Sequence, residues 1–272
     1  MRFRLFVLDV DGTLIGESGE MKPRVKDAVR SIQVAGAAVA ICTGRPLASC
    51  RPFIEELGLL GPQIVVSGAL VRDVAAGRTV FQRPLTVEQV TRLVEFGRAR
   101  ELCLELYTDK SHVVERDWVE SRRHAISVRV DYQFGDFDAM IGHVEIVKGQ
   151  IIVAAERTPW LVGELRANLG DTIAFSIATP MAPCEGLKCI NLVDARVSKG
   201  EAVRQVTDYY RLRQADVVGV GDAPNDLDMF AAVGWRVAMG NSDPAILAVA
   251  DEVCPDVESE GLAIAIPSLL NR

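Results

Sequence analysis

Two aspartates stand one residue apart directly after a short apolar run near the start of the chain. Asp9 and Asp11 follow the run 5–8, and Gly12 comes next. Such a run predicts a buried strand, and in a doubly wound parallel sheet ligands bind beyond the carboxyl ends of the strands. A glycine permits the sharp turn that would aim both carboxylates at one site. The same residues also suit an ordinary polar turn.

Polar groups that could take part in the same chemistry follow other predicted strands or begin a predicted helix. An acidic cluster without His or Cys suits a hard cation held through oxygen, which indicates Mg2+. A lysine and a hydroxyl beside it suit a phosphoryl group. Taken singly, each residue is also compatible with a helix cap or an exposed side chain. The residues are Thr43, Gly44 and Arg45 after the run 38–42, Lys199 at a helix start, and Asp222, Asn225 and Asp226 after the run 217–220.

The elements that would position these groups alternate in type at both ends of the chain. Before about residue 82 and after about 195, short apolar runs alternate with amphipathic stretches, which predicts an α/β fold with a doubly wound parallel sheet. Pro23 suits the first turn of a helix that ends near Gly36. The other expected elements are strands at 38–42, 217–220 and 235–239, and helices at 199–210 and around 225–233.

The segment 83–194 has a different pattern of apolar and polar residues. It predicts an antiparallel sheet that carries helices, inserted into the first domain as an α+β domain. We therefore expect a core made of residues 1–82 and 195–272, interrupted by the insertion. The strands expected in the insertion are 103–107, 112–116, 126–132, 145–156 and 189–193, and the helices are 87–100 and 159–170.

Four short motifs occur in a fixed order along the chain. They are DVDGT (9–13), TGR (43–45), SKG (198–200) and GDAPND (221–226). Together they resemble the signature motifs of the haloacid dehalogenase superfamily of hydrolases, whose core is a Rossmann-like parallel sheet. The insertion resembles the type IIB cap of the Cof-like phosphatase branch. One departure is Ser67 followed by Gly68, where Cof-like relatives usually have Asn-Gly.

The resemblance implies a role for each strand-end residue. Asp9 is expected to be the nucleophile and Asp11 the general acid and base. The expected phosphate-binding residues are Thr43, Gly44, Arg45, Lys199 and Asn225. The expected Mg2+ ligands are Asp9, the main-chain carbonyl of Asp11, Asp222 and Asp226.

The same resemblance implies a Mg2+-dependent phosphatase that acts on a small phosphorylated metabolite, with a sugar phosphate as the leading candidate. Asp11 disfavours dehalogenation and ion pumping, because dehalogenases lack a second aspartate and ion pumps carry threonine there. Two alternatives stay open at this point. One is a phosphomutase of the phosphomannomutase type, and the other is a protein that senses a phosphorylated ligand without turnover.

Composition narrows the range of partners. The chain has 272 residues and a net charge of -7, and it lacks a block of basic residues, so we expect neither nucleic acid nor an anionic membrane as a partner. No apolar run is long enough to span a bilayer, and no CxxC pair occurs among the six cysteines. We therefore expect a cytoplasmic protein with reduced thiols, as a monomer or homodimer.

Basic residues of the insertion are the remaining group of interest. Arg116, Arg122, Arg123 and His124 favour a solvated basic helix or loop over a site that grips a second anion. His112 and His143 fit no metal-ligand spacing in the sequence and receive no predicted role.

Overall fold

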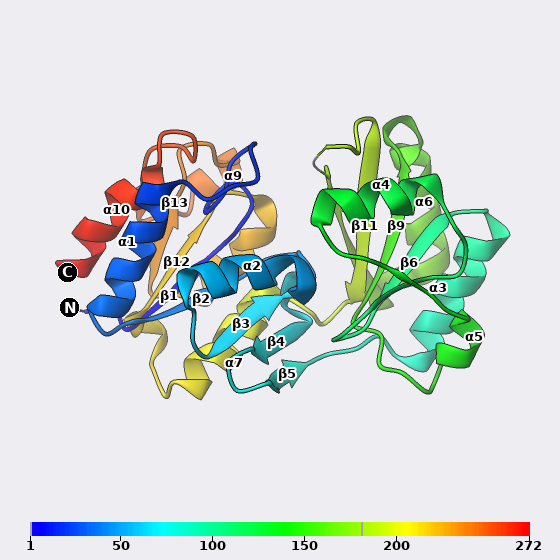
Figure 1. The fold of residues 1–272 in the computed structure, drawn as a ribbon, viewed down its shortest axis with the longest axis horizontal. Helices are drawn as coiled ribbons and strands as arrows, with labels where there is room; N and C mark the ends of the chain where they lie inside the picture. Colours follow the sequence, from blue (N-terminus) through cyan, green and yellow to red (C-terminus); the bar gives the residue numbers. More distant parts are fainter. Residues whose placement is uncertain (1, 181) are drawn as a thin grey trace. The chain divides into compact units, whose positions relative to one another are not determined.

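A computed structural model of the chain describes residues 2–180 and 182–272. The chain divides into two compact units, which Figure 1 traces. The first unit comprises Met1–Arg45, Cys50–Phe81 and Ser198–Arg272, and the second comprises Pro46–Ser49 and Gln82–Val197.

The first unit is built on a five-stranded parallel sheet with strand order β14-β13-β12-β1-β2. The central strand β1 pairs with β12 on one side and β2 on the other, and Leu8 lies opposite both Val220 and Ile41. The residues that follow these three positions therefore leave the sheet at one edge. The strands are β1 (Leu5–Leu8), β2 (Ala38–Ile41), β12 (Val217–Gly221), β13 (Trp235–Ala238) and β14 (Glu252–Val253).

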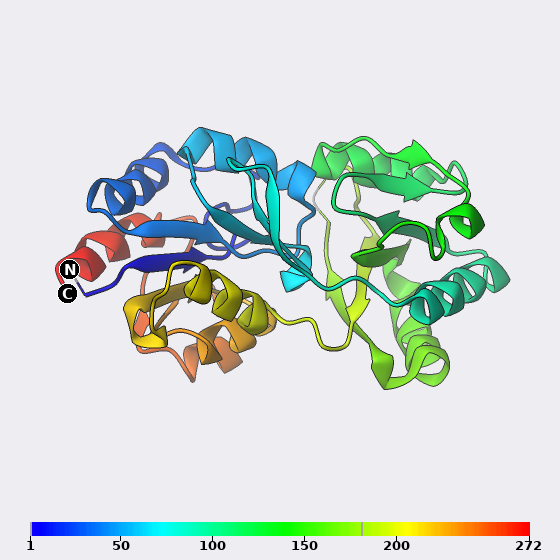
Figure 2. The same cartoon turned by 90° about the horizontal axis from the view of Figure 1, so that it is seen from below.

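Helices cover both faces of this sheet, as Figure 2 shows for α1 and α7, which lie on opposite sides of it. Helix α1 begins at a proline and buries Val25, Val29 and Ile32, which recur at helical spacing. Apolar residues of α7 and α8 pack with β1 and β12 in a continuous core. The helices of four or more residues are α1 (Pro23–Val34), α7 (Lys199–Tyr209), α8 (Leu227–Ala231), α9 (Pro244–Leu247) and α10 (Gly261–Leu270), and α2 (Leu47–Leu57) links the first two segments of the unit.

A second, small sheet follows β1 and β2 in the sequence and precedes β12, β13 and β14. Its strands are β3 (Pro62–Val65), β4 (Leu70–Asp73) and β5 (Arg78–Gln82), in that order. A 3-10 turn, η1 (Val66–Gly68), joins β3 to β4, and two further turns are η4 (Gln214–Asp216) and η5 (Pro224–Asp226).

The second unit contains a six-stranded sheet with order β10-β11-β9-β6-β7-β8. Its neighbouring strands are antiparallel except for β7 and β8, which run parallel. The strands are β6 (Cys103–Tyr107), β7 (His112–Val114), β8 (Gln133–Phe134), β9 (Lys148–Ala154), β10 (Ile173–Ala178) and β11 (Leu187–Asp194). The accompanying helices are α3 (Val87–Ala99), α4 (Val119–Val128), α5 (Phe137–Met140) and α6 (Thr158–Leu169).

The two faces of this sheet differ in chemistry. Leu104, Leu106 and Ile151 belong to an apolar core that includes residues of α3 and α6. Alternate residues of the same strands point the other way, because successive strand side chains point to opposite faces. They include the buried polar residues Glu105 and Gln150, which lie opposite each other on β6 and β9.

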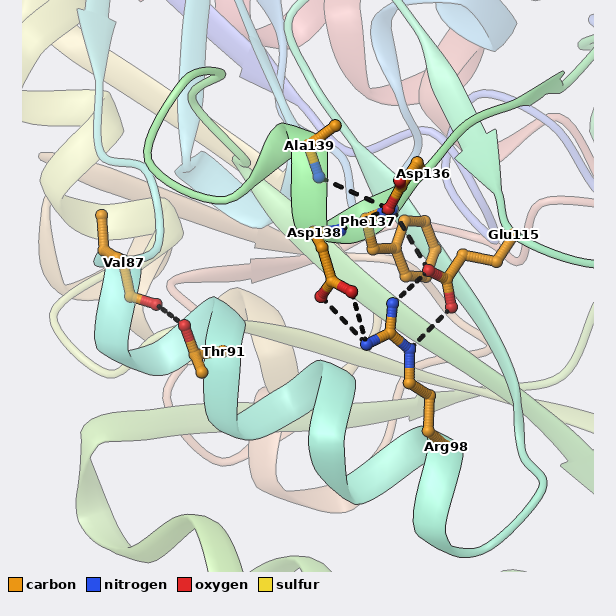
Figure 3. Close-up of polar contacts among 8 residues, drawn as sticks. All are labelled: Val87, Thr91, Arg98, Glu115, Asp136, Phe137, Asp138 and Ala139. Atoms are coloured by element: carbon orange, nitrogen blue, oxygen red, sulfur yellow. Dashed lines mark hydrogen bonds and ion pairs between the residues drawn. The ribbon is translucent and has the colours of Figure 1, made fainter.

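Helix α3 is fixed at both ends by polar contacts. A capping box between Thr86 and Gln89 closes its first turn. Near its last turn, Arg98 pairs with Glu115 and with Asp138 of α5, as Figure 3 shows. The Arg98 Nη1 atom lies 2.9 Å from Asp138 Oδ1, and Nε lies 3.0 Å from Glu115 Oε2.

The strand predicted at 126–132 is wrong. Residues 126–128 are the last turn of α4, and the strand in this region is the two-residue β8. Helix α4 buries Ser121 and His124, which are three residues apart, so its buried face follows the helical period and not strand alternation. The helix ends where Arg129 takes a left-handed conformation with φ of 56°.

Other sequence boundaries differ by smaller amounts. The helix expected around 225–233 is split into η5 and the short helix α8, which ends at Ala231. Strand β9 starts at Lys148, later than the predicted 145. Strand β10 was not predicted, because its residues carry no clear alternation of apolar and polar side chains.

Candidate active site

Asp9 lies directly beyond β1 and is almost fully buried. Its backbone N–H donates to the carbonyl of Val220 at 2.9 Å, which extends the pairing of β1 with β12 by one residue. The Lys199 ammonium group donates to Asp9 Oδ1 at 2.5 Å and to Asp226 Oδ1 at 2.6 Å. A cation with two carboxylates thus lies at the carboxyl edge of the sheet, inside the protein.

Helix α7 and turn η5 hold these partners in place. Ser198 caps α7 by accepting from the N–H of Glu201 at 3.0 Å, and Lys199 is the first residue of the helix. Asp226 is anchored by its second oxygen, which accepts from the backbone N–H groups of Asp222 and Ala223, both at 3.1 Å. Asp226 therefore orients Lys199 while it closes its own turn.

Asp222 completes a group of three carboxylates. Asp9, Asp222 and Asp226 each offer one oxygen, and these three atoms lie within 4.8 Å of one another. Asp222 accepts from Thr13 Oγ1 at 3.2 Å and from Asn241 Nδ2 at 3.3 Å. All donors in the group are oxygens, so the residues fit Mg2+, which prefers oxygen ligands, better than a soft metal.

Gly12 makes the close approach of the two loops possible. Its φ is +81°, and a Cβ atom at this position would lie 2.2 Å from Asp222 Oδ2. Any other residue would both strain the backbone and displace the Asp222 carboxylate. A glycine is thus required at position 12 both for the turn and for the close approach of Asp222.

Asp11 is separated from the buried group. Its side chain is 53% exposed and forms a two-pronged ion pair with Arg45, in which Nη2 lies 2.5 Å from Oδ1 and Nε lies 2.8 Å from Oδ2. Both predicted catalytic aspartates therefore have a cationic partner. Lys199 pairs with Asp9, and Arg45 pairs with Asp11. The guanidinium also lies over the ring of Phe53, 5.7 Å from its centre.

The remaining predicted phosphate-binding residues surround the same edge from two loops. Thr43 is buried after β2, and its hydroxyl accepts from the N–H of Arg45 at 3.2 Å. A Cβ atom on Gly44 would lie 3.3 Å from Ser67 Oγ, so the loops after β2 and β3 meet there. Ser67 has a φ of 58°, a left-handed conformation in which asparagine is favoured.

Asn225 is exposed in turn η5. Within the described part of the chain, its side chain has no hydrogen-bond partner. It lies next to Asp226, whose side chain points to Lys199 instead. The structure thus brings Asp9, Lys199, Asp222 and Asp226 together. Among the described residues, the Asn225 side-chain amide makes no hydrogen bond to this group.

Burial and charge shift the pKa values of the central groups. Burial raises the pKa of Asp9 well above its ordinary range; Lys199 opposes this rise, and Asp226 and Asp222 add to it. Burial lowers the pKa of Lys199, but Asp9 and Asp226 raise it by more, so Lys199 stays protonated. Burial, with a contribution from Asp226, raises the pKa of Asp222 to about 7. The three carboxylates therefore compete for a positive charge.

Asn241 is a site residue that the sequence reasoning missed. Its side-chain amide donates to the carbonyl of Gly12 at 3.0 Å as well as to Asp222, and its oxygen accepts from the N–H of Val257 at 2.9 Å. It comes two residues after the predicted strand 235–239, so the strand-end rule that located the other residues applies to it as well.

Sequence comparison shows which known proteins the chain is similar to. Residues 6–266 match the sequence profile of the haloacid dehalogenase-like hydrolases. The chain is 26% identical over 270 residues to a 5-amino-6-(5-phospho-D-ribitylamino)uracil phosphatase, YitU, of Bacillus subtilis (strain 168), covering 95% of this chain and 94% of that one.

Solved structures show the same fold. A haloacid dehalogenase-like hydrolase from Bacteroides thetaiotaomicron superposes with a TM-score of 0.86 at 24% identity, covering 98% of this chain and 99% of the other. A haloacid dehalogenase subclass IIB sugar phosphatase superposes with a TM-score of 0.81 at 16% identity, covering 98% of each chain. The profile match spans nearly the whole sequence, and the chain therefore belongs to the haloacid dehalogenase-like hydrolases.

Proposed function

We propose that this chain is a Mg2+-dependent phosphatase that hydrolyses the phosphomonoester of a small metabolite, with a sugar phosphate as the leading candidate. The observation that carries the proposal is the buried contact of Lys199 with Asp9 and Asp226 beside Asp222. It supplies a nucleophile, a fixed cation and an oxygen-only cation site at one sheet edge.

In the first proposed step, an Asp9 carboxylate oxygen attacks phosphorus and forms an aspartyl-phosphate, while the bond from phosphorus to the ester oxygen breaks. Asp11 gives a proton to the departing alkoxide. In the second step, water attacks the same phosphorus, Asp11 takes the proton of that water, and the bond to Asp9 breaks. Inorganic phosphate leaves, and both aspartates return to their starting forms.

Mg2+, when bound by Asp9, Asp222, Asp226 and the Asp11 carbonyl, would offset the negative charge of the carboxylates and of the phosphoryl group. Lys199 contributes a second positive charge that is already fixed by Asp226. We assign Thr43, Gly44 and Asn225 to contacts with the phosphoryl oxygens. Arg45 forms an ion pair with the Asp11 carboxylate. This ion pair holds Asp11 in a defined position until the substrate binds and takes the place of Arg45.

We further propose that the inserted segment, residues 83–194, selects the leaving group. Two relatives support phosphorylated small molecules as substrates, because one is named for a phosphoribityl compound and the other for sugar phosphates. All six cysteines are free and buried, which supports a reducing compartment such as the cytoplasm. In residues 2–180 and 182–272, no helix has the length and apolar character that a membrane span requires.

The test is release of inorganic phosphate from sugar phosphates, nucleoside monophosphates and an aryl phosphate, with Mg2+ and with a chelator. We expect release that requires Mg2+ and is lost in Asp9→Asn. The matched control is Asp27→Asn, which makes the same change on an exposed face of α1 and should leave activity unchanged.

Three outcomes would contradict the proposal. Phosphate release that persists in Asp9→Asn would remove Asp9 as the nucleophile. Conversion of a sugar phosphate into its isomer after addition of a bisphosphate activator, without release of inorganic phosphate, would indicate a phosphomutase. Tight ligand binding without turnover would indicate a sensor.

A further inference from the structure

A second cluster of ionisable side chains lies in the inserted unit, away from the aspartates in sequence and in chemistry. Glu105 comes from β6, His112 from β7 and His124 from α4. All three are buried, with exposures of 0%, 3% and 4%. None of them belongs to the motifs that identify the family.

The fold brings these three side chains to one face of the sheet. His112 pairs with Tyr107, which stands two residues after Glu105 on the neighbouring strand, so His112 and Glu105 are diagonal neighbours on that face. Helix α4 lies against β6 and β9 and buries His124. The convergence is therefore produced by strand register and by the buried side of a helix.

The donor atoms are close enough to share one ion. His112 Nε2 and His124 Nδ1 each lie 3.0 Å from Glu105 Oε2, and one ligand atom from each residue lies within 4.8 Å of the others. An ion about 2.1 Å from each of three tetrahedral donors needs donors roughly 3.4 Å apart. Two of the separations, at 3.0 Å, are slightly shorter than this value, and the third lies within 4.8 Å.

The cluster also has polar atoms whose bonding capacity is unused. Glu105 Oε1 and His112 Nδ1 are buried and have no hydrogen-bond partner among the described residues. Leaving a buried polar atom unpaired is unfavourable, and native proteins rarely retain such atoms without a reason. A cation bound to Glu105 would give the free carboxylate oxygen a partner.

Surrounding residues hold the ligands in place. The Tyr107 hydroxyl donates to Glu105 Oε2 at 2.7 Å, and Gln150 Nε2 donates to the same oxygen at 3.1 Å. The Tyr107 ring stacks on the His112 ring with 4.5 Å between centres, and the Tyr132 ring meets His112 edge-on. Such outer contacts fix ligand orientation in metal sites.

Lys148 is a cation on the same part of the sheet, and its ammonium group lies 4.8 Å from the centre of the Tyr107 ring. Its positive charge disfavours a metal cation in the cluster. Burial lowers the pKa of Lys148 to about 8, so it can release its proton at modest cost. The competing arrangement is an ion pair between Glu105 and protonated histidines, which would leave Glu105 Oε1 without a partner.

We propose that Glu105, His112 and His124 form a binding site for a first-row transition-metal dication, with Zn2+ as the best fit. Two imidazoles and one carboxylate are a ligand set that zinc accepts, with a fourth position for water or another oxygen donor. The set contrasts with the oxygen-only group near Asp9, so the two sites should discriminate between Zn2+ and Mg2+.

The test uses the full chain, stripped with a chelator and then saturated with Mg2+. Zn2+ is added, free ion is removed, and bound zinc is counted by elemental analysis and by calorimetric titration. We expect one zinc per chain. His112→Gln and His124→Gln should each weaken zinc binding by more than the about 10-fold to 100-fold that loss of an outer-shell partner causes.

Two control variants distinguish zinc binding at this cluster from zinc binding at the aspartate group. His143→Gln changes the remaining histidine, which is exposed, and should bind zinc like the parent. Asp222→Asn should also keep its zinc, because it alters only the oxygen-ligand group. Zinc binding is counted without any activity assay, so its outcome is independent of whether phosphate is released.

X-ray absorption at the zinc edge of the unaltered protein provides a readout that needs no variant. Scattering from two imidazole rings would support the site even if a histidine variant failed to fold. The proposal is overturned if the parent takes up no zinc under saturating Mg2+, if the spectrum lacks imidazole scattering, or if both folded variants bind as tightly as the parent.

Discussion

Replacing Asp222 with asparagine should raise the melting temperature of the metal-free protein at pH 8. Burial, with a contribution from Asp226, raises the pKa of Asp222 to about 7, so the folded protein must ionise a disfavoured carboxyl at pH 8. An amide has nearly the same shape and carries no charge. The Thr13 hydroxyl can accept from the new amide nitrogen, and the amide oxygen can accept from Asn241, so both present contacts can be kept.

The size of the effect follows from the pKa. A difference of about three pH units between the folded and unfolded carboxyl corresponds to ~4 kcal/mol. Solvent reaches part of Asp222 and Lys199 lies nearby, so we take about half of this, ~2 kcal/mol. For a protein of this length, that free energy of unfolding corresponds to a rise of about 4 °C in melting temperature.

The pH dependence gives the sign of the effect. Because the folded pKa of Asp222 lies above the unfolded value, its protonated form contributes stability at low pH that is lost as pH rises through about 7. The advantage of Asp222→Asn should therefore be small near pH 4, grow with pH, and level off above pH 8. In saturating Mg2+ the parent should have the higher melting temperature, because it keeps all of the metal ligands and is stabilised more by the bound ion.

The assay is thermal unfolding followed by calorimetry from pH 4 to 8.5, in a chelator and in Mg2+, with Asp27→Asn as the control for an exposed aspartate. An Asp222→Asn variant that melts at or below the parent temperature at pH 8 in chelator would refute the reasoning. A gain of equal size at every pH would do the same, because it could not come from titration of this carboxyl.

Other substitutions test the remaining contacts. Gly12→Ala should lower both Mg2+ affinity and phosphate release, because its Cβ would meet Asp222 Oδ2 at 2.2 Å, and titration calorimetry checks this. Lys199→Met should destabilise the metal-free protein by about 3–5 kcal/mol in urea unfolding, because it leaves buried carboxylates unpaired. Arg45→Lys should lower kcat about tenfold in steady-state assays, because lysine cannot reproduce the two-pronged contact with Asp11. Leu106→Ala should destabilise the protein by about 2–5 kcal/mol, measured by denaturant unfolding, because Leu106 is fully buried in the core of the inserted unit.

The core sheet was predictable because strands covered on both faces are continuously apolar. The runs at 5–8, 38–42 and 217–220 have this form, and all three became neighbouring parallel strands. Parallel strands deliver their carboxyl ends to one edge, so Asp9 and Asp222 could be placed together from the sequence. Asn241 follows β13 and obeys the same rule, but the prediction did not include it.

The contacts between side chains of the site were harder to predict from the sequence. In the structure Lys199 contacts Asp226, which also accepts two backbone N–H bonds, and the contact of Lys199 with a phosphoryl group stays a prediction. Arg45 forms an ion pair with Asp11, which was not predicted, and its contact with phosphate stays a prediction. Such choices depend on distances between loops that are far apart in the chain, which spacing within a motif does not encode.

The inserted unit departed most from the sequence prediction. Its strand at 126–132 was wrong, because the β-branched residues there suggested a strand, whereas the buried face follows the helical period of α4. His124 was predicted to lie with neighbouring arginines on a solvated basic helix or loop, whereas the structure buries it. Its approach to Glu105 and His112 has no sequence signature, because the three residues come from two strands and a helix.

The interruption of the first unit by the second affects how the protein can be made. Strand β1 needs both β2 and β12, and about 180 residues separate the two partners in the chain. A ribosome that adds 5–20 residues per second leaves one edge of β1 open for roughly 10 s or more. The inserted unit, nearly continuous from Gln82 to Val197, can fold during that interval. Ribosome-stalled chains that end before Val217 should therefore contain a folded insertion and a chaperone-dependent N-terminal segment.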